Sequence, residues 1–358
     1  MTVFLPQCLP TLIGSMPLRD HQEAHALVMA HTPEIPPWVQ LPAFRQEGML
    51  QQFLPGLPGL AVAGDRQFVD TGSSDFEAGL VTFYEAYLAC SEDAANLDES
   101  IFALTDQTAA GFSTLKDGLE TSDAVCHALK GQVSGPITFA TGVKDQNDQA
   151  IFYHDQLRDA AVKLLALKAR WQVRALAKFR KPVIIFLDEP ALAGFGSSEF
   201  ISITREEVIA CLEEVAEAVH AEGGLAGVHV CANTDWSMLL DSSLDIINFD
   251  AYAYFDRFIL YPEKLKNFID GGGILAWGIV PTLKAEDIER ESAETLQVKW
   301  EAQLDQVVSL GLARETVRAQ SLITPSCGVG SLKPPQALKV LEMTRDLSRL
   351  IRQTMDAV

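Results

Sequence analysis

The stretch PVIIFLDEPALAGFGSSEFISITREEVIACLEEVAEAVHAEGGLAGVHVC, residues 182–231, decides the fold because it contains one complete strand–helix–strand unit. Short β-branched runs at 182–190 and 225–231 predict strands. Between them, residues 204–223 carry apolar side chains at a period near 3.6, which predicts a helix. Thr204 stands three residues before a glutamate, a capping-box pattern for the start of that helix. Two strands joined in this way predict a parallel βαβ unit.

The same alternation continues along the chain. Further amphipathic stretches at 155–179 and 291–311 predict helices. The predicted strands are 9–16, 37–42, 131–140, 182–190, 225–231, 244–252, 273–281 and 319–327. Eight such units close most naturally into a TIM (β/α)8 barrel. A doubly wound sheet is the alternative, but no G-x-G-x-x-G motif follows the first strand.

One gap between predicted strands is too long for a single crossover helix. Residues 43–130 hold helical patterns and loops rich in glycine and proline. We interpret them as a helical and loop insertion after strand two, standing over the C-terminal face of the barrel. The whole chain, 1–358, is then one domain, which is plausible at this length mainly for an α/β barrel with insertions.

Composition restricts the partners and the compartment. The net charge is −20, from 48 acidic and 28 basic side chains. Such a surface repels nucleic acid and anionic membranes, so neither is expected as a partner. No apolar run is long enough to span a membrane, and no basic residue precedes Arg19 as a secretory signal would require. The six cysteines have no disulfide-framework spacing, so a reducing, cytoplasmic location is expected.

Polar side chains follow the predicted strands. His229 and Cys231 are two apart and point to one face of an extended strand. Asp250 and Cys327 end the sixth and eighth strands, and all strand ends meet where barrel enzymes have their active sites. Histidine, cysteine and carboxylate ligands around an open position are typical of catalytic zinc. Simpler interpretations remain: Cys327 as a buried small side chain, and Asp250 and Asp188 as helix caps.

The motifs LIGSMP, GPIT, LDEPAL, HVC and TPSCG follow one another across nearly the whole chain. Together they resemble the C-terminal catalytic barrel of cobalamin-independent methionine synthase, in a shortened single-barrel form. The wider group includes uroporphyrinogen decarboxylase and zinc methyltransferases acting on coenzyme M. The resemblance implies a TIM barrel whose zinc activates a thiol. It implies His229, Cys231 and Cys327 as zinc ligands, with Asp250 where the family usually has a glutamate ligand.

The same resemblance implies the substrate residues. Asp188 matches the residue that holds the amino group of the substrate, and the segment around Ser15 matches backbone contacts to the amino acid. The expected substrate-binding residues are Ile13, Gly14, Ser15 and Asp188. The expected catalytic residues are Asp188 and Glu189 of LDEPAL. The glutamate that follows strand two in the long enzymes has no clear match, and Glu47 is a candidate at an offset position.

Two departures from the family concern the methyl donor. No histidine follows His229, although the folate-using enzymes have one after strand seven that protonates the leaving nitrogen. Gly142 stands where those enzymes place a tryptophan against the pterin. A cob(I)alamin leaving group needs no proton. We therefore expect methyl transfer from a methylcorrinoid, either methylcobalamin or a corrinoid protein, to homocysteine. No D-x-H-x-x-G motif is present, so any corrinoid is a substrate and not a resident cofactor.

Other functions remain open at this point. One is a methyl-tetrahydrofolate-dependent methionine synthase, and another is a methyltransferase for a different thiol such as coenzyme M. A uroporphyrinogen decarboxylase-like enzyme would need cationic clamps, and the loops offer few basic residues. A non-catalytic protein that binds corrinoid or stores zinc would leave the DEP carboxylates unexplained.

Overall fold

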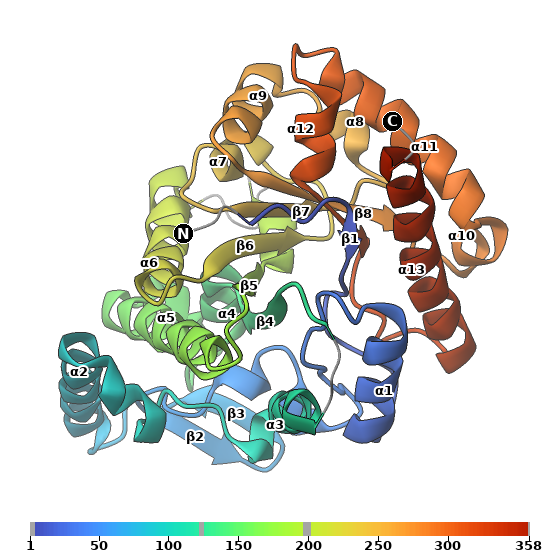
Figure 1. Cartoon of the computed structure of the whole chain (residues 1–358). Helices are drawn as coiled ribbons and strands as arrows, with labels where there is room; N and C mark the ends of the chain where they lie inside the picture. The colour runs from blue at the N-terminus through green and yellow to red at the C-terminus, as the bar shows by residue number, and fades with distance from the viewer. Residues whose placement is uncertain (1–3, 122–124, 196–201, 357–358) are drawn as a thin grey trace.

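The computed structural model describes residues 4–121, 125–195 and 202–356. Over these ranges, seven parallel strands form one curved sheet with helices around its outer face (Figure 1). The strand order is β1-β9-β8-β7-β6-β5-β4. The strands are β1 (Leu9–Pro10), β4 (Leu129–Ser134), β5 (Val183–Asp188), β6 (Leu225–Val230), β7 (Ile246–Phe249), β8 (Ile274–Val280) and β9 (Ser321–Pro325). The predicted α/β class with a parallel sheet is therefore confirmed.

Helices connect these strands and form the outer layer. The α-helices are α1 (His21–His31), α2 (Phe76–Glu92), α3 (Asp106–Thr121), α4 (Pro136–Gly142), α5 (Asp155–Ala177), α6 (Arg205–Ala221), α7 (Trp236–Leu240), α8 (Phe255–Phe258), α9 (Pro262–Asp270), α10 (Ala285–Arg290), α11 (Ala293–Val308), α12 (Arg314–Ala319) and α13 (Pro334–Asp356). The 3-10 helices are η1 (Arg45–Glu47), η2 (Gln51–Phe53), η3 (Ala94–Glu99), η4 (Ile151–Tyr153) and η5 (Pro190–Gly194). Across the described ranges, each helix is too short or too polar to cross a membrane.

The strand–helix–strand unit that opened the sequence analysis is present as β5, α6 and β6. Thr204 is the N-cap of α6: the Glu207 amide donates to its hydroxyl oxygen at 3.2 Å, and its own amide donates to the Glu207 carboxylate at 2.9 Å. Gly223 follows the helix with a φ of 75°, a conformation that suits glycine. The predicted capping box is therefore confirmed, and it fixes the point at which α6 begins.

Two predicted strands differ from the structure because of proline. Residues 37–42 form only isolated bridges: the Trp38 amide donates to Lys130 O at 3.2 Å, and the Gln40 amide donates to Gly14 O at 3.0 Å. Pro37 begins this segment directly after Pro36, and neither residue has an amide hydrogen for a ladder. Within the described residues, the parallel sheet thus has seven strands and not the eight expected. The predicted strand 131–140 ends earlier, because Pro136 begins helix α4, a position that favours proline.

The inner face of the sheet is mainly apolar where the strands begin and polar where they end. Ten buried apolar side chains form a separate interior cluster: Leu9, Ile13, Ile35, Ala128, Ile184, Phe186, Ile246, Ile274, Ala276 and Leu322. Every second residue along a strand faces this interior. On β5 the sequence of such residues is Ile184, Phe186 and then Asp188, and on β7 Asn248 follows Ile246. The polar interior positions therefore lie toward the C-terminal ends of the strands.

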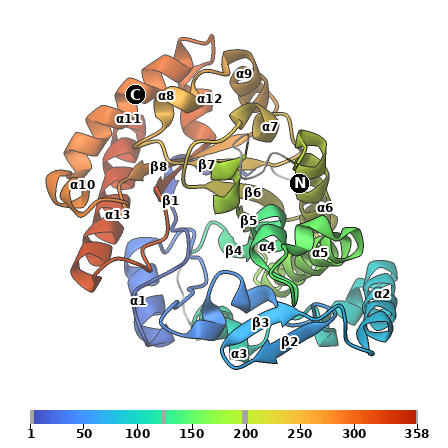
Figure 2. The ribbon, with the colours of Figure 1, turned by 180° about the vertical axis from the view of Figure 1, so that it is seen from behind.

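Residues 43–130 contain the hairpin β2 (Leu60–Ala63) and β3 (Arg66–Val69), together with α2 and α3. The hairpin lies on the same side of the molecule as α1 and α3 (Figure 2). It contacts the loop that follows α4: the Val69 amide donates to Lys144 O at 2.9 Å, and Arg66 pairs with Asp148 at 2.7 Å. Residues 122–124 of this segment lie outside the described ranges.

Candidate metal and substrate site

Three of the predicted zinc ligands converge at the C-terminal ends of β6 and β9. His229 is in β6, and Cys231 follows it on the same face. Cys327 lies two residues beyond β9. One ligand atom from each residue lies within 4.8 Å of the others. Parallel strands bring residues almost a hundred positions apart to one edge of the sheet, as the sequence predicts.

The ring of His229 is held in a defined orientation by Asn248 on the neighbouring strand β7. The Asn248 amide nitrogen donates to Ala276 O at 2.9 Å and to Thr324 Oγ1 at 2.8 Å. Its oxygen is therefore left to accept a hydrogen bond from His229 Nδ1. The ring proton is then on Nδ1, so Nε2 carries the lone pair that a metal requires.

The donor set fits zinc. His229 Nε2 is buried and has no hydrogen-bond partner among the described residues, which costs about 1–3 kcal/mol unless a ligand is bound. The Cys231 and Cys327 thiols share a hydrogen bond that lowers the pKa of Cys231 and raises that of Cys327. One thiolate is thus already favoured. One imidazole nitrogen and two sulfurs make up a ligand set that proteins use to hold catalytic zinc with an open position.

Asp250 does not join this group. Its carboxylate accepts a hydrogen bond from the Ala253 amide at 2.8 Å, and its carbonyl accepts one from the Tyr254 amide at 2.9 Å. Within the described chain, the potential metal-binding group consists of His229, Cys231 and Cys327. The short aspartate side chain closes its own turn after β7, as aspartate commonly does. Asp250 thus closes a turn and does not cap α8, whose N-cap is Tyr254, and among the described residues no fourth ligand joins the group.

Asp188 ends β5 and pairs in register with His229 on β6. Its Oδ1 atom is buried and has no partner in the described chain. Burial raises its pKa to about 6, while the nearby His229 and Lys130 act in the opposite direction. Asp188, His229, Cys231 and Cys327 all line one cavity of about 440 Å³. A free carboxylate oxygen in this cavity suits a cationic group on the ligand.

Glu189, the next residue, faces away from this cavity. Its carboxylate accepts hydrogen bonds from the Ile137 amide and the Thr138 amide, both at 2.8 Å, and from the Thr138 hydroxyl at 2.6 Å. A Cβ atom at Gly135 would lie 2.1 Å from the Glu189 carboxyl carbon, so only glycine fits there. Glu189 thus caps α4 and joins it to β5. The carboxylate of this predicted catalytic residue is thus hydrogen-bonded to α4, and Glu189 does not line the cavity.

The opposite wall of the cavity comes from the first strand and the segment after it. Ile13 and Ser15 line the cavity, while Gly14 between them has a φ of 144°. Glu47 also lines it, with its carboxylate 2.7 Å from His21 Nε2 and 2.8 Å from the Leu41 amide. The sequence offered Glu47 only as an offset candidate, because the path between residues 41 and 47 is irregular. The structure brings it to the same cavity as Asp188.

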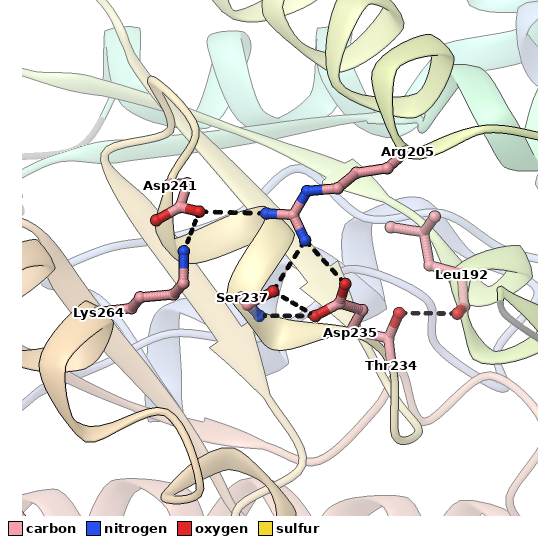
Figure 3. Close-up of polar contacts among 7 residues, drawn as sticks. All are labelled: Leu192, Arg205, Thr234, Asp235, Ser237, Asp241 and Lys264. Carbon is pink, nitrogen blue, oxygen red and sulfur yellow. Dashed lines mark hydrogen bonds and ion pairs between the residues drawn. The ribbon is translucent and has the colours of Figure 1, made fainter.

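The loop that carries Cys231 is anchored at its far end (Figure 3). The Thr234 hydroxyl donates to Leu192 O at 2.8 Å, and Arg205 pairs with Asp235 at 2.8 Å. Arg205 is the first residue of α6, so this contact fixes the loop to the helix that precedes β6. These contacts fix the position of the loop that follows Cys231.

A second cavity of about 600 Å³ adjoins the first, and both are lined by Met49 and Pro190. Thr138, Thr141, Gly142, Lys144 and Tyr153 are among the residues of its wall. The two cavities lie side by side, and His229, Cys231 and Cys327 line only the first of them.

Replacing Asn248 by alanine is expected to weaken zinc binding by about 10–100-fold, because the tautomer and orientation of His229 would no longer be fixed. A zinc titration against a competing chelator measures this. Asn96→Ala, in the exposed η3 segment, is the matched control and should leave the affinity unchanged. Equal zinc affinity in Asn248→Ala and the wild type would show that Asn248 does not orient the ligand.

No protein-family model matches the chain, and no curated protein matches it in sequence. Among solved structures, it is similar to a B12-independent methionine synthase from Shewanella sp. W3-18-1 in complex with selenomethionine. The TM-score is 0.60 at 14% identity, over 98% of this chain and 99% of that one. A GH20 catalytic module of a pneumococcal exo-β-D-N-acetylglucosaminidase aligns with a TM-score of 0.46 at 10% identity, over 95% of this chain and 85% of that one. The likeness to the methionine synthase shows that the two proteins have a related fold.

Proposed function

We propose that the protein is a zinc-dependent thiol methyltransferase that converts homocysteine to methionine. The observation that carries this proposal is the convergence of His229, Cys231 and Cys327 in a cavity where an oxygen of Asp188 has no partner. The related fold of a methionine synthase supports it. A second adjoining cavity is consistent with a reaction of two substrates.

Each part of the site has a task in this proposal. Zinc held by His229, Cys231 and Cys327 would supply the Lewis acidity that keeps a thiol of ordinary pKa about 8.5 deprotonated at neutral pH. Asp188 accepts the ammonium group of the acceptor. The backbone around Ser15 holds the rest of the amino acid. Fixing the acceptor in this way presents its sulfur for in-line attack on a methyl group.

We propose a methylcorrinoid as the donor, from free methylcobalamin or a corrinoid protein. The sulfur forms a bond to the methyl carbon, and both electrons of the cobalt–carbon bond stay on cobalt, which leaves as cob(I)alamin without a proton. The absence of any histidine after His229 in the sequence fits this leaving group. At Gly142, an added Cβ would lie 2.7 Å from the Leu50 side chain, so the structure has no space there for a stacking tryptophan unless Leu50 moves.

A methyl-tetrahydrofolate donor is the second candidate, and one observation favours it. His21 lies 2.7 Å from Glu47, which lines the metal-binding cavity. This pair could deliver the proton that a leaving folate nitrogen needs. A uroporphyrinogen decarboxylase-like activity has no such support, because Lys144 is the only lysine or arginine in the described walls of the two cavities.

The remaining expectations belong to the same proposal. We propose that residues 37–42 complete an eight-stranded barrel, since Trp38 and Gln40 of this segment hydrogen-bond to β4 and to the segment after β1. We propose that 43–130 is an insertion that shapes the C-terminal mouth, since Met49 lines both cavities. All six cysteines are free, which supports a cytoplasmic location.

The donor is tested by supplying homocysteine with methylcobalamin or methyl-tetrahydrofolate and measuring methionine by mass spectrometry. We expect faster methionine formation from methylcobalamin, because only that donor leaves without a proton. His21→Phe serves as the control: it should leave the methylcobalamin reaction unchanged. An equal or higher rate with methyl-tetrahydrofolate that falls in His21→Phe would replace the corrinoid proposal by the folate one.

A further inference from the structure

Lys130 is the second residue of β4, and its side chain lies wholly buried inside the barrel. Its Nζ atom donates to Ile13 O at 2.6 Å and to Gln132 Oε1 at 3.3 Å. It also lies 4.5 Å from the centre of the Phe186 ring. The ammonium group is thus enclosed by neutral dipoles and an aromatic face, directly beneath the segment that lines the metal-binding cavity.

Among the described residues, the Lys130 ammonium group has no direct counter-ion. In the described part of the chain, no carboxylate forms an ion pair with Lys130. Burial lowers its pKa to about 8, and the charge of Asp188 acts in the opposite direction. The ammonium form still predominates at neutral pH. Burying a charge without an ionic partner reduces the free energy of unfolding. We therefore expect the charge of Lys130 to have a function that a neutral side chain could not provide.

The contact with Ile13 O links Lys130 to the cavity wall. In a trans peptide, the carbonyl and the amide hydrogen point in opposite directions. Ile13 O faces Lys130, so the Gly14 amide of the same peptide points away from it. Within residues 4–121, 125–195 and 202–356, no acceptor takes a hydrogen bond from the Gly14 or Ser15 amide. A hydrogen bond to a carbonyl polarises the whole peptide, so Lys130 strengthens Gly14 as a donor.

The Gly14 conformation is also held in place. Its φ of 144° is one that residues with a side chain rarely adopt, and a Cβ there would lie 3.1 Å from the Gln132 side chain. Gln132 in turn donates to Trp38 O at 3.1 Å. Lys130 and Gln132 therefore fix the Ile13–Gly14 peptide, whose amide hydrogen points away from Lys130.

We propose that Lys130 is a positioning residue that makes the cavity selective for a thiol bearing a carboxylate. The inference rests on the proposed function, the binding of homocysteine, and adds to it a residue outside the cavity wall. The carboxylate accepts hydrogen bonds from the Gly14 and Ser15 amides, and the ammonium of Lys130 below stabilises its negative charge. Asp188 provides the complementary charge for an ammonium group. The substrate class is then an α-amino-acid thiol rather than a simple aminothiol.

The test compares two ligands of the zinc-loaded protein by isothermal titration calorimetry without any methyl donor. Homocysteine is one ligand, and 3-aminopropane-1-thiol, which lacks only the carboxylate, is the other. The wild type should bind homocysteine at least about tenfold more tightly, as expected for a charge-assisted contact. Lys130→Met should lose this preference while its affinity for 3-aminopropane-1-thiol stays within about twofold.

Lys168→Met is the matched control, because Lys168 is an equally buried lysine on α5, outside the cavity wall. It should keep the wild-type preference. Equal binding of the two ligands by the wild type overturns the inference without any variant. So does an equal loss for both ligands in Lys130→Met. Tight, carboxylate-dependent binding without methionine formation would contradict the proposed function and support this inference.

Discussion

Replacing both Cys231 and Cys327 by alanine is expected to reduce bound zinc from about one ion per chain to background level. The double substitution removes both sulfurs of the three-ligand group and leaves the single nitrogen of His229. The zinc affinity should fall by more than the roughly 10–100-fold expected when only a residue that hydrogen-bonds to a ligand, such as Asn248, is removed. Elemental analysis of protein purified without added metal measures it, and methyl transfer to homocysteine should disappear with the metal.

The matched control replaces Cys90 and Cys211, two other free and buried cysteines that lie on α2 and α6. That variant should retain the wild-type zinc content and thereby separate a ligand effect from a general loss of thiols. Zinc retained in Cys231→Ala, Cys327→Ala, with the fold verified by circular dichroism, would show that the metal binds elsewhere.

Asp188→Asn is expected to raise the KM for homocysteine by about 10–100-fold, which corresponds to a charge-assisted hydrogen bond of about 1.5–3 kcal/mol. The reason is that the free Oδ1 of Asp188 is the carboxylate oxygen without a partner in the described cavity wall. Steady-state kinetics measure the effect. Zinc content should stay unchanged because Asp188 is not part of the metal-binding group.

Asp250→Asn provides the comparison, since Asp250 is a second buried carboxylate near the site. Its oxygen accepts from the Ala253 amide, and an asparagine oxygen can do the same. This variant should therefore keep a KM close to that of the wild type. Loss of zinc in Asp188→Asn, or an equal rise of KM in both variants, would assign Asp188 a different role.

The sequence predicts the fold where local signals agree with the tertiary structure. In 182–231, the apolar runs and the Thr204 capping box determine both strands and the helix between them. Residues 37–42 form isolated bridges and not a continuous strand, because Pro36 and Pro37 have no amide hydrogen to donate to a ladder. The strand predicted over 131–140 is too long because Pro136 can begin a helix as readily as end a strand.

The site residues likewise divide into those that local sequence signals identify and those whose role depends on the tertiary structure. His229 and Cys231 could be paired from their spacing alone, and Cys327 from its place after the last strand. Asn248 and Lys130 could not be found in this way, because each lies within a fully buried strand and its role depends on the register of neighbouring strands. Glu189 and Asp250 show the opposite case. Each residue comes at the end of a strand, where a ligand or catalytic group is expected. The structure shows that nearby backbone amides donate hydrogen bonds to both carboxylates.

X-ray absorption spectroscopy at the zinc edge, recorded before and after addition of homocysteine, tests the central claim most directly. The account predicts sulfur neighbours at about 2.3 Å from Cys231 and Cys327, with nitrogen from His229, in the protein alone. On addition of homocysteine, the number of sulfur neighbours should rise by one. An unchanged sulfur shell at saturating homocysteine would contradict the claim that this site binds and activates a thiol.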